Sequence, residues 1–274
     1  MTLFKLKSNR DPVTVSGQAF GVAVALEADD SSQLERLTEW LPPCWRIGEA
    51  GADELRFKLT KIGHDAYQLL RDGAEIGGGT LEETVRGYEW MLRTHIAKTA
   101  PEHLFVHAGT VAHGGRAIVI PGLSFSGKTT LVTALVQAGA VYYSDEYAVF
   151  DKAGLVHPYP KPLAIRSPDA RHGSEHHHPE QLGATVGDDP IPIGLVVCSQ
   201  YRSGAEWEPV ELTPAEAMLE LMVHAFKGGE QAEGSMSMLG KAVVGVSGLK
   251  GDRGDAAALA PELLARIERP AVQP

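Results

Sequence analysis

Residues 117–138 have the sequence AIVIPGLSFSGKTTLVTALVQA. The apolar run Ala117–Ile120 is typical of a buried strand, and Thr130–Ala138 is typical of a helix that ends at Gly139. Between them, Gly122–Thr129 matches G-x-x-x-x-G-K-[ST], the pattern of a phosphate-binding loop. A chance match is the alternative. Because strand, loop and helix follow in the order that the motif requires, we favour the phosphate-binding loop.

The residue types of this loop suit the binding of a nucleotide. Gly122 and Gly127 allow the backbone to turn its N–H groups toward phosphate oxygens, and the N-terminus of the helix adds partial positive charge. Lys128 supplies a cation for the terminal phosphates, and the hydroxyl of Thr129 can join the ligands of Mg²⁺. We therefore expect a Mg²⁺-nucleotide, bound by Gly122, Ser124, Ser126, Gly127, Lys128, Thr129 and Thr130.

An acidic pair, Asp145 and Glu146, follows soon after the loop. Asp145 lies 17 residues beyond Lys128 (145 − 128), an interval that holds one helix, one turn and a short strand over Val141–Tyr143. The pair should lie at the carboxyl end of the strand next to the loop, where open α/β sheets bind ligands. Phosphoryl transfer to a hydroxyl needs a base and a carboxylate for Mg²⁺. A solvated turn is the alternative, and the neighbouring loop favours the functional interpretation.

Composition limits the class of protein. With 274 residues, the chain can form one sizeable α/β domain and a smaller one. A net charge of −10 argues against a general nucleic-acid binder, which needs a basic face. Cys44 and Cys198 have no metal-ligand spacing and are typical of reduced thiols. Without a signal-peptide core or an apolar run of membrane-spanning length, the sequence predicts a cytoplasmic protein that does not bind membranes.

We expect two domains, a small α+β module over residues 1–100 and an α/β nucleotide domain over residues 101–274. In the first, the patterns predict strands at Phe20–Leu26 and Leu55–Leu59, a helix capped by Ser31 or Ser32, a hairpin over residues 67–76 and a helix that starts at the capping box Thr80/Glu83. In the second, they predict strands at 104–112, 116–120, 193–198 and 242–249, a hairpin over 147–157, loops at 167–190 and 228–237, and helices at 213–226 and 256–267.

Several stretches in this order resemble the catalytic domain of HPr kinase/phosphorylase: Val106–Thr110, Gly122–Thr130 and Ser144–Glu146. The resemblance covers about residues 103–166. It implies the HPr kinase C-terminal fold, which is also the fold of phosphoenolpyruvate carboxykinase. ATP-dependent phosphoenolpyruvate carboxykinase is similar to this chain at Gly122–Leu131 and at the acidic pair. The stretches 124–130, 142–147 and 158–163 are most similar to HPr-kinase-related proteins of bacteria.

The resemblance also implies roles for individual residues. His107 and Asp145 match the catalytic histidine and the first acidic residue, which accepts the proton of a serine hydroxyl. Lys128 and Thr129 match the residues that hold ATP and Mg²⁺, and Glu146 matches the second acidic residue. On its own, a strand histidine such as His107 is more often structural. The related kinases assemble into rings, so a homo-oligomer is compatible with the resemblance.

The sequence departs from the family in three places. HPr kinase has Gly-Lys-Ser-Glu where this chain has Gly127–Thr130, so one acidic side chain beside the metal is missing. Residues after 166 do not match the arginine-bearing signature segment, and the first hundred residues do not resemble the usual N-terminal domain. HPr as the substrate and the reverse phosphorylase reaction are therefore not expected. His172 and His176–His178 could hold a metal, but three consecutive histidines favour a polar loop.

Together these patterns predict an ATP- and Mg²⁺-dependent kinase. Asp145 would deprotonate a hydroxyl, that of a serine in a peptide or protein, with His107 and Lys128 as further catalytic residues. Thr129 and Glu146 would hold the metal. Two alternatives remain open at this point: a nucleotide-sensing binding module without transfer activity, and a kinase of a small-molecule alcohol.

Overall fold

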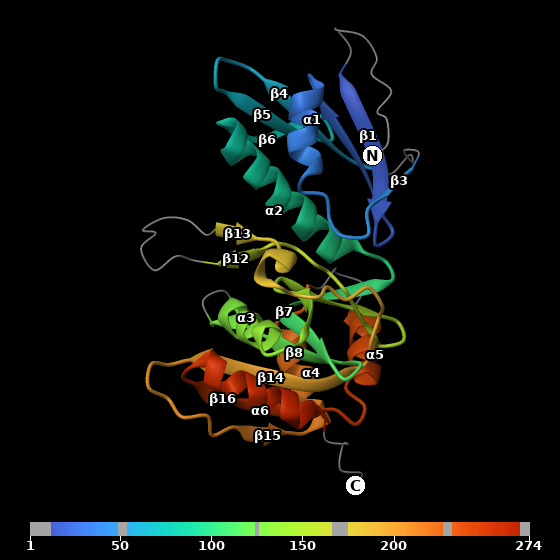
Figure 1. Ribbon diagram of the computed structural model, residues 1–274. Helices are drawn as coiled ribbons and strands as arrows, with labels where there is room; N and C mark the ends of the chain where they lie inside the picture. The colour runs from blue at the N-terminus through green and yellow to red at the C-terminus, as the bar shows by residue number, and fades with distance from the viewer. Residues whose placement is uncertain (1–11, 49–53, 124–125, 166–174, 227–231, 269–274) are drawn as a thin grey trace. The chain divides into compact units, whose positions relative to one another are not determined.

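The computed structural model describes residues 12–48, 54–123, 126–165, 175–226 and 232–268 (Figure 1). The chain divides into two compact units, Met1–Pro101 and Glu102–Pro274. Each unit contains a mixed sheet with α-helices, so the class is mixed α/β. Within the described residues, no helix is both long and apolar enough to cross a membrane.

The first unit is a six-stranded sheet in the order β3-β1-β2-β4-β5-β6. Strands β2 and β4 are parallel, and every other neighbouring pair in this sheet is antiparallel. Two helices pack against the sheet and against each other. The elements are β1 Val13–Ala19, β2 Val22–Ala28, α1 Ser31–Thr38, β3 Arg46–Ile47, β4 Leu55–Lys61, β5 Tyr67–Arg71, β6 Ala74–Gly79 and α2 Leu81–Thr99.

The predicted hairpin and the second helix of this unit are confirmed. Asp72 and Gly73 both have positive φ, 51° and 84°, as the tight turn between β5 and β6 requires. The Thr80 hydroxyl accepts a hydrogen bond from the Glu83 N–H, and the Glu83 carboxylate bonds back to the Thr80 N–H. This capping box starts α2, whose side chains Val85, Tyr88, Leu92 and Ile96 are buried.

Two details of the first unit were predicted wrongly. Phe20 has φ 51° and lies in a turn with Gly21, so the strand begins only at Val22, and the turn joins it to the unpredicted strand β1. Helix α1 is capped by Asp30, whose carboxylate accepts the Gln33 N–H at 2.9 Å, and not by Ser31 or Ser32. A carboxylate caps a helix as well as a hydroxyl does, so the sequence offered several equivalent starting points.

The second unit has a sheet in the order β11-β10-β7-β8-β14-β16-β15, with β9 also paired to β7. Strands β8, β14 and β16 are parallel, and the other pairings in this sheet are antiparallel. Its elements are β7 His103–His113, β8 Arg116–Pro121, α3 Lys128–Gln137, β9 Val141–Ser144, β10 Tyr147–Asp151, β11 Val156–His157, β14 Ile193–Tyr201, β15 Val210–Leu212, α4 Pro214–Val223, α5 Ala232–Ala242, β16 Ser247–Arg253 and α6 Ala256–Glu268.

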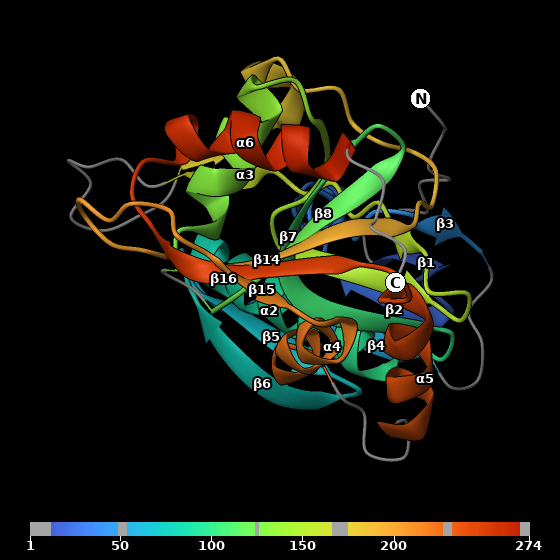
Figure 2. The same cartoon turned by 90° about the horizontal axis from the view of Figure 1, so that it is seen from below.

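Helices cover both faces of this sheet (Figure 2). Ile118 and Ile120 of β8 pack in one core with α3 and α6, whereas Ala117 and Val119 pack in the other core with α4 and α5. A strand buried on both faces needs a continuous apolar run, and this explains why residues 117–120 contain no polar side chain.

The segments predicted as loops contain regular structure where they are described. Within 167–190, β13 Glu175–His177 pairs with β12 Leu163–Ile165, and a 3-10 helix covers Pro179–Leu182; His172 lies outside the described residues. Within 228–237, residues from Ala232 onward belong to α5. The predicted strand at 242–249 is shifted, because Ala242 ends α5 and β16 begins at Ser247. Helix α4 stops before Phe226.

Strand β7 and helix α3 approach each other closely at a glycine. A Cβ atom on Gly109 would lie 2.5 Å from Cγ2 of Val132, which is closer than two carbon atoms can pack. We expect Gly109→Ala to lower the free energy of unfolding by about 1–3 kcal/mol, as overpacking of a core does. Thermal or urea unfolding measures the change.

The matched control for Gly109→Ala is the double variant with Val132→Ala, which removes the methyl group that the new Cβ would meet. We expect the double variant to lose clearly less stability than the sum of the two single variants. Additive losses would show that the contact with Val132 is not the reason for glycine at this position.

Candidate functional site

The predicted site residues gather at one edge of the second sheet. The sequence analysis predicted that β9 lies next to β8. This prediction was wrong, because β7 lies between the two strands. Since β7 is antiparallel to both, β8 and β9 run in the same direction and end at the same edge. The segment with the predicted phosphate-binding motif after β8 and the acidic pair after β9 therefore share this edge, where open α/β sheets bind ligands.

A buried serine fixes the acidic pair between two strands. The Ser144 Oγ accepts hydrogen bonds from the N–H groups of Glu146 at 3.1 Å and Tyr147 at 2.9 Å. The chain thereby passes from β9, which pairs with residues 110–112 of β7, to β10, which pairs with residues 103–107. Asp145 and Glu146 occupy the step between the two strands.

Lys128 is folded back onto the loop that precedes it. Its Nζ donates to the carbonyl oxygens of Gly122 at 2.7 Å and Leu123 at 3.0 Å, and the residue is 7% exposed. Burial lowers the pKa of the Lys128 ammonium, while the negative charges of Asp145 and Glu146 act in the opposite direction. The ammonium group is thus held inside the loop that is predicted to bind the phosphates of a nucleotide.

Thr129 and Asp145 are joined directly. The Thr129 hydroxyl donates to Oδ2 of Asp145 at 2.8 Å, whereas the buried Oδ1 finds no hydrogen-bond partner among the described residues. Burial raises the pKa of Asp145 to about 7, Glu146 adds to the rise, and Thr129 and Lys128 oppose it. A carboxyl group with a pKa near neutrality is suited to accept a proton at physiological pH.

His107 lies beside the second acidic residue. Its Nε2 is 4.0 Å from Oε1 of Glu146, and in the sheet it stands opposite Tyr147. Its carbonyl accepts the Gly122 N–H at 3.4 Å, and its own N–H donates to the carbonyl of His224 at 2.9 Å. The backbone of His107 is therefore bonded to the start of the loop, and its side chain lies next to Glu146.

The remaining loop residues differ in their environment. Gly127, with φ 88°, is the N-cap of α3, and Thr130 is exposed on the first turn of that helix. Ser126 is buried, and its Oγ has no hydrogen-bond partner among the described residues. Ser124 lies outside the described residues. Across the part of the chain that is described, three or more His, Cys, Asp or Glu side chains nowhere cluster as metal ligands.

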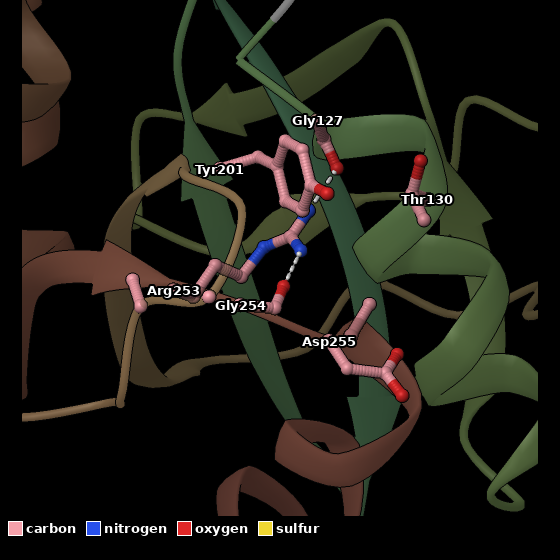
Figure 3. A pocket seen from close by; sticks show the side chains of 9 residues that line it. Gly127, Thr130, Tyr201, Arg253, Gly254 and Asp255 are labelled. Atoms are coloured by element: carbon pink, nitrogen blue, oxygen red, sulfur yellow. Dashed lines mark hydrogen bonds between the residues drawn. The ribbon is translucent and has the colours of Figure 1, made fainter.

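Two residues near the loop were missed by the sequence analysis. Arg253, at the end of β16, donates from Nη2 to the Gly127 carbonyl at 2.7 Å and from Nη1 to the Gly254 carbonyl at 2.9 Å (Figure 3). His224 follows α4; burial lowers its pKa, and the charge of Lys128 lowers it further. The sequence signal for Arg253 was weak: a charged residue between Gly251 and Gly254, four residues beyond the predicted strand at 242–249.

Similarity to known proteins is found among solved structures. No protein-family model and no curated protein matches the chain. Among solved structures, the chain is similar to the Hpr(Ser) kinase/phosphatase from Coxiella burnetii, with 17% sequence identity and a TM-score of 0.36. The match covers 60% of this chain and 95% of the other.

Proposed function

We propose that this chain is an ATP- and Mg²⁺-dependent kinase that transfers the γ-phosphoryl group to a hydroxyl, that of a serine in a peptide or protein. The observation that carries the proposal is the Thr129–Asp145 hydrogen bond, because it places a buried carboxyl group with a raised pKa directly against the phosphate-binding motif. Residues 102–274 form the catalytic domain in this proposal. No role is assigned to the first unit.

The residues present fit a magnesium ion. The Thr129 hydroxyl can donate a hydrogen bond to Asp145 and still offer a lone pair of Oγ1 to a metal ion. Glu146 adds a second carboxylate at the same edge of the sheet. The buried Oδ1 of Asp145, without a partner among the described residues, is a further oxygen in need of a positive neighbour. When bound, the ion would neutralise charge on the phosphate oxygens.

The transfer step assigns one task to each side chain. Asp145 accepts the proton of the acceptor hydroxyl, whose oxygen forms a bond to the γ-phosphorus while the bond from that phosphorus to the bridging oxygen of ADP breaks. Lys128 and the loop N–H groups stabilise the negative charge on the transferring group. His107 lies close enough to Glu146 to orient that carboxylate.

The direct test is binding of MgATP to the purified chain by isothermal titration calorimetry, followed by phosphorus NMR of the same sample. We expect binding and a slow loss of the γ-phosphate to water, because the base is in place without its acceptor. Hydrolysis that disappears in Asp145→Asn supports the kinase. Binding with no hydrolysis in either protein favours the nucleotide-sensing module, and no binding rejects both functions.

A further inference from the structure

A pocket of about 620 Å³ lies beside the phosphate-binding motif (Figure 3). In the order of the strands, it is on the side of β8 away from β9 and Asp145. Its lining includes Gly127 and Thr130 at the start of α3, Tyr201 at the end of β14, and Arg253 at the end of β16. Because β8, β14 and β16 are parallel, the pocket is at the carboxyl ends of three parallel strands.

The chain connections make this place a switch point of the sheet. From β8 the chain passes through α3 to β9, on the far side of β7, whereas β14 leads through β15, α4 and α5 to β16 in the opposite direction. Crossovers that leave two neighbouring parallel strands in opposite directions open a crevice between them, and ligands of open α/β sheets bind there.

Arg253 provides an independent sign of a ligand. The residue is 1% exposed, and its Nε–H has no hydrogen-bond partner among the described residues. A buried donor without a partner is costly unless a bound molecule satisfies it. Two of its five N–H donors already bind the carbonyls of Gly127 and Gly254, which fixes the guanidinium in the wall of the pocket.

We propose that this pocket binds the nucleoside part, base and ribose, of the nucleotide whose phosphates bind the loop; the inference rests on the proposed function. The pocket begins at Gly127 and Thr130, so a ligand whose phosphates meet the N-terminus of α3 extends directly into it. Tyr201 is 51% exposed, and its ring, over which Arg253 lies at 5.6 Å, offers an aromatic surface for a base.

Asp255 supplies the polar end of the same pocket. One of its carboxylate oxygens accepts the N–H of Ala257 at 2.9 Å, which fixes the side chain at the start of α6. A fixed carboxylate is suited to accept hydrogen bonds from ribose hydroxyls, as acidic residues do in other α/β nucleotide sites. Arg253 also connects the pocket to the phosphate-binding motif, because its hydrogen bond to the Gly127 carbonyl fixes the backbone at the end of the loop.

The test compares two ligands that share phosphates but differ in the nucleoside, MgATP and magnesium tripolyphosphate. Ala205, which lines the pocket, is replaced by tryptophan to fill it, and Tyr201→Ala removes the aromatic face in a second variant. We expect each change to weaken MgATP binding at least about tenfold and tripolyphosphate binding less than about twofold in titration calorimetry.

The matched control is Val244→Trp, which adds the same side chain at an exposed residue that does not line the pocket. Its affinity for both ligands should equal that of the unchanged protein. Equal weakening of both ligands by Ala205→Trp and Tyr201→Ala, or no weakening, would overturn the pocket assignment while leaving the proposed kinase intact. If the unchanged protein binds neither ligand, the proposed function fails, and the pocket assignment fails with it.

Discussion

Replacement of Lys128 by alanine is expected to weaken MgATP binding at least about a hundredfold, which corresponds to about 2.7 kcal/mol. Lys128 is buried and held by two carbonyl oxygens of the loop, so its charge is positioned before any ligand arrives. A cation fixed in a poorly solvated site interacts with phosphate more strongly than a mobile surface lysine does. Titration calorimetry with MgATP measures the loss.

The control for Lys128→Ala is Lys152→Ala, which removes the same charge at the exposed turn between β10 and β11, where Lys152 pairs with Glu102. Surface pairs of this kind contribute little, so both the fold and the nucleotide affinity should remain. If Lys128→Ala folds and binds MgATP as tightly as the unchanged protein, the motif at residues 122–129 does not bind phosphate.

Replacement of Asp145 by asparagine is expected to reduce phosphoryl transfer, including the slow transfer to water, by about a hundredfold or more while MgATP affinity stays within a few fold. Asparagine can still accept the hydrogen bond of the Thr129 hydroxyl, so the geometry of the site is retained. It cannot take a proton from the acceptor. Phosphorus NMR of the titrated sample reports the rate, and near-normal transfer would exclude Asp145 as the base.

The same substitution should stabilise the protein without ligand. The pKa of Asp145 is about 7 in the folded chain, against about 3.9 for an unperturbed aspartate. Between these values the unfolded chain has released a proton that the folded chain retains, so this carboxyl lowers stability as pH rises from about 4 to about 7. In metal chelator, Asp145→Asn should therefore raise Tm by several degrees at pH 8 and by less at pH 5.

A melting temperature that does not change with Asp145→Asn at pH 8 would show that the carboxylate is well accommodated without a ligand.

Glu146→Gln is a useful comparison, because it removes the neighbouring carboxylate from the same connection between β9 and β10. We expect Glu146→Gln mainly to raise the magnesium concentration needed for phosphoryl transfer, because loss of a carboxylate ligand weakens metal binding.

The elements near the loop could be predicted because their patterns are local. An apolar run, a glycine pattern and a helix define residues 117–138, and the Gly114-Gly115 and Asp72-Gly73 turns identify hairpins by backbone conformation alone. The contact between Thr129 and Asp145 also agrees with the short interval between the two motifs.

Other features depend on long-range pairing, which local patterns do not contain. Strand β7 separates β9 from β8, and nothing in residues 141–144 specifies which strand they join. Arg253 is 126 residues away from the Gly127 carbonyl that it binds. The first half of helix α5, up to Ser237, was predicted as a loop, because Gly234, Ser235 and Ser237 weaken its helical pattern while its buried contacts stabilise it.

Strand β7 couples the site to the stability of the whole second unit. It pairs with β8, β9 and β10, and the N–H of His107 binds the chain after α4. Local opening of the site would therefore disturb an interior strand of the sheet, and we expect this to require a large part of the free energy of unfolding. Amide protons of β7 should be among the slowest to exchange with solvent, and a bound nucleotide would slow them further by stabilising the entire unit.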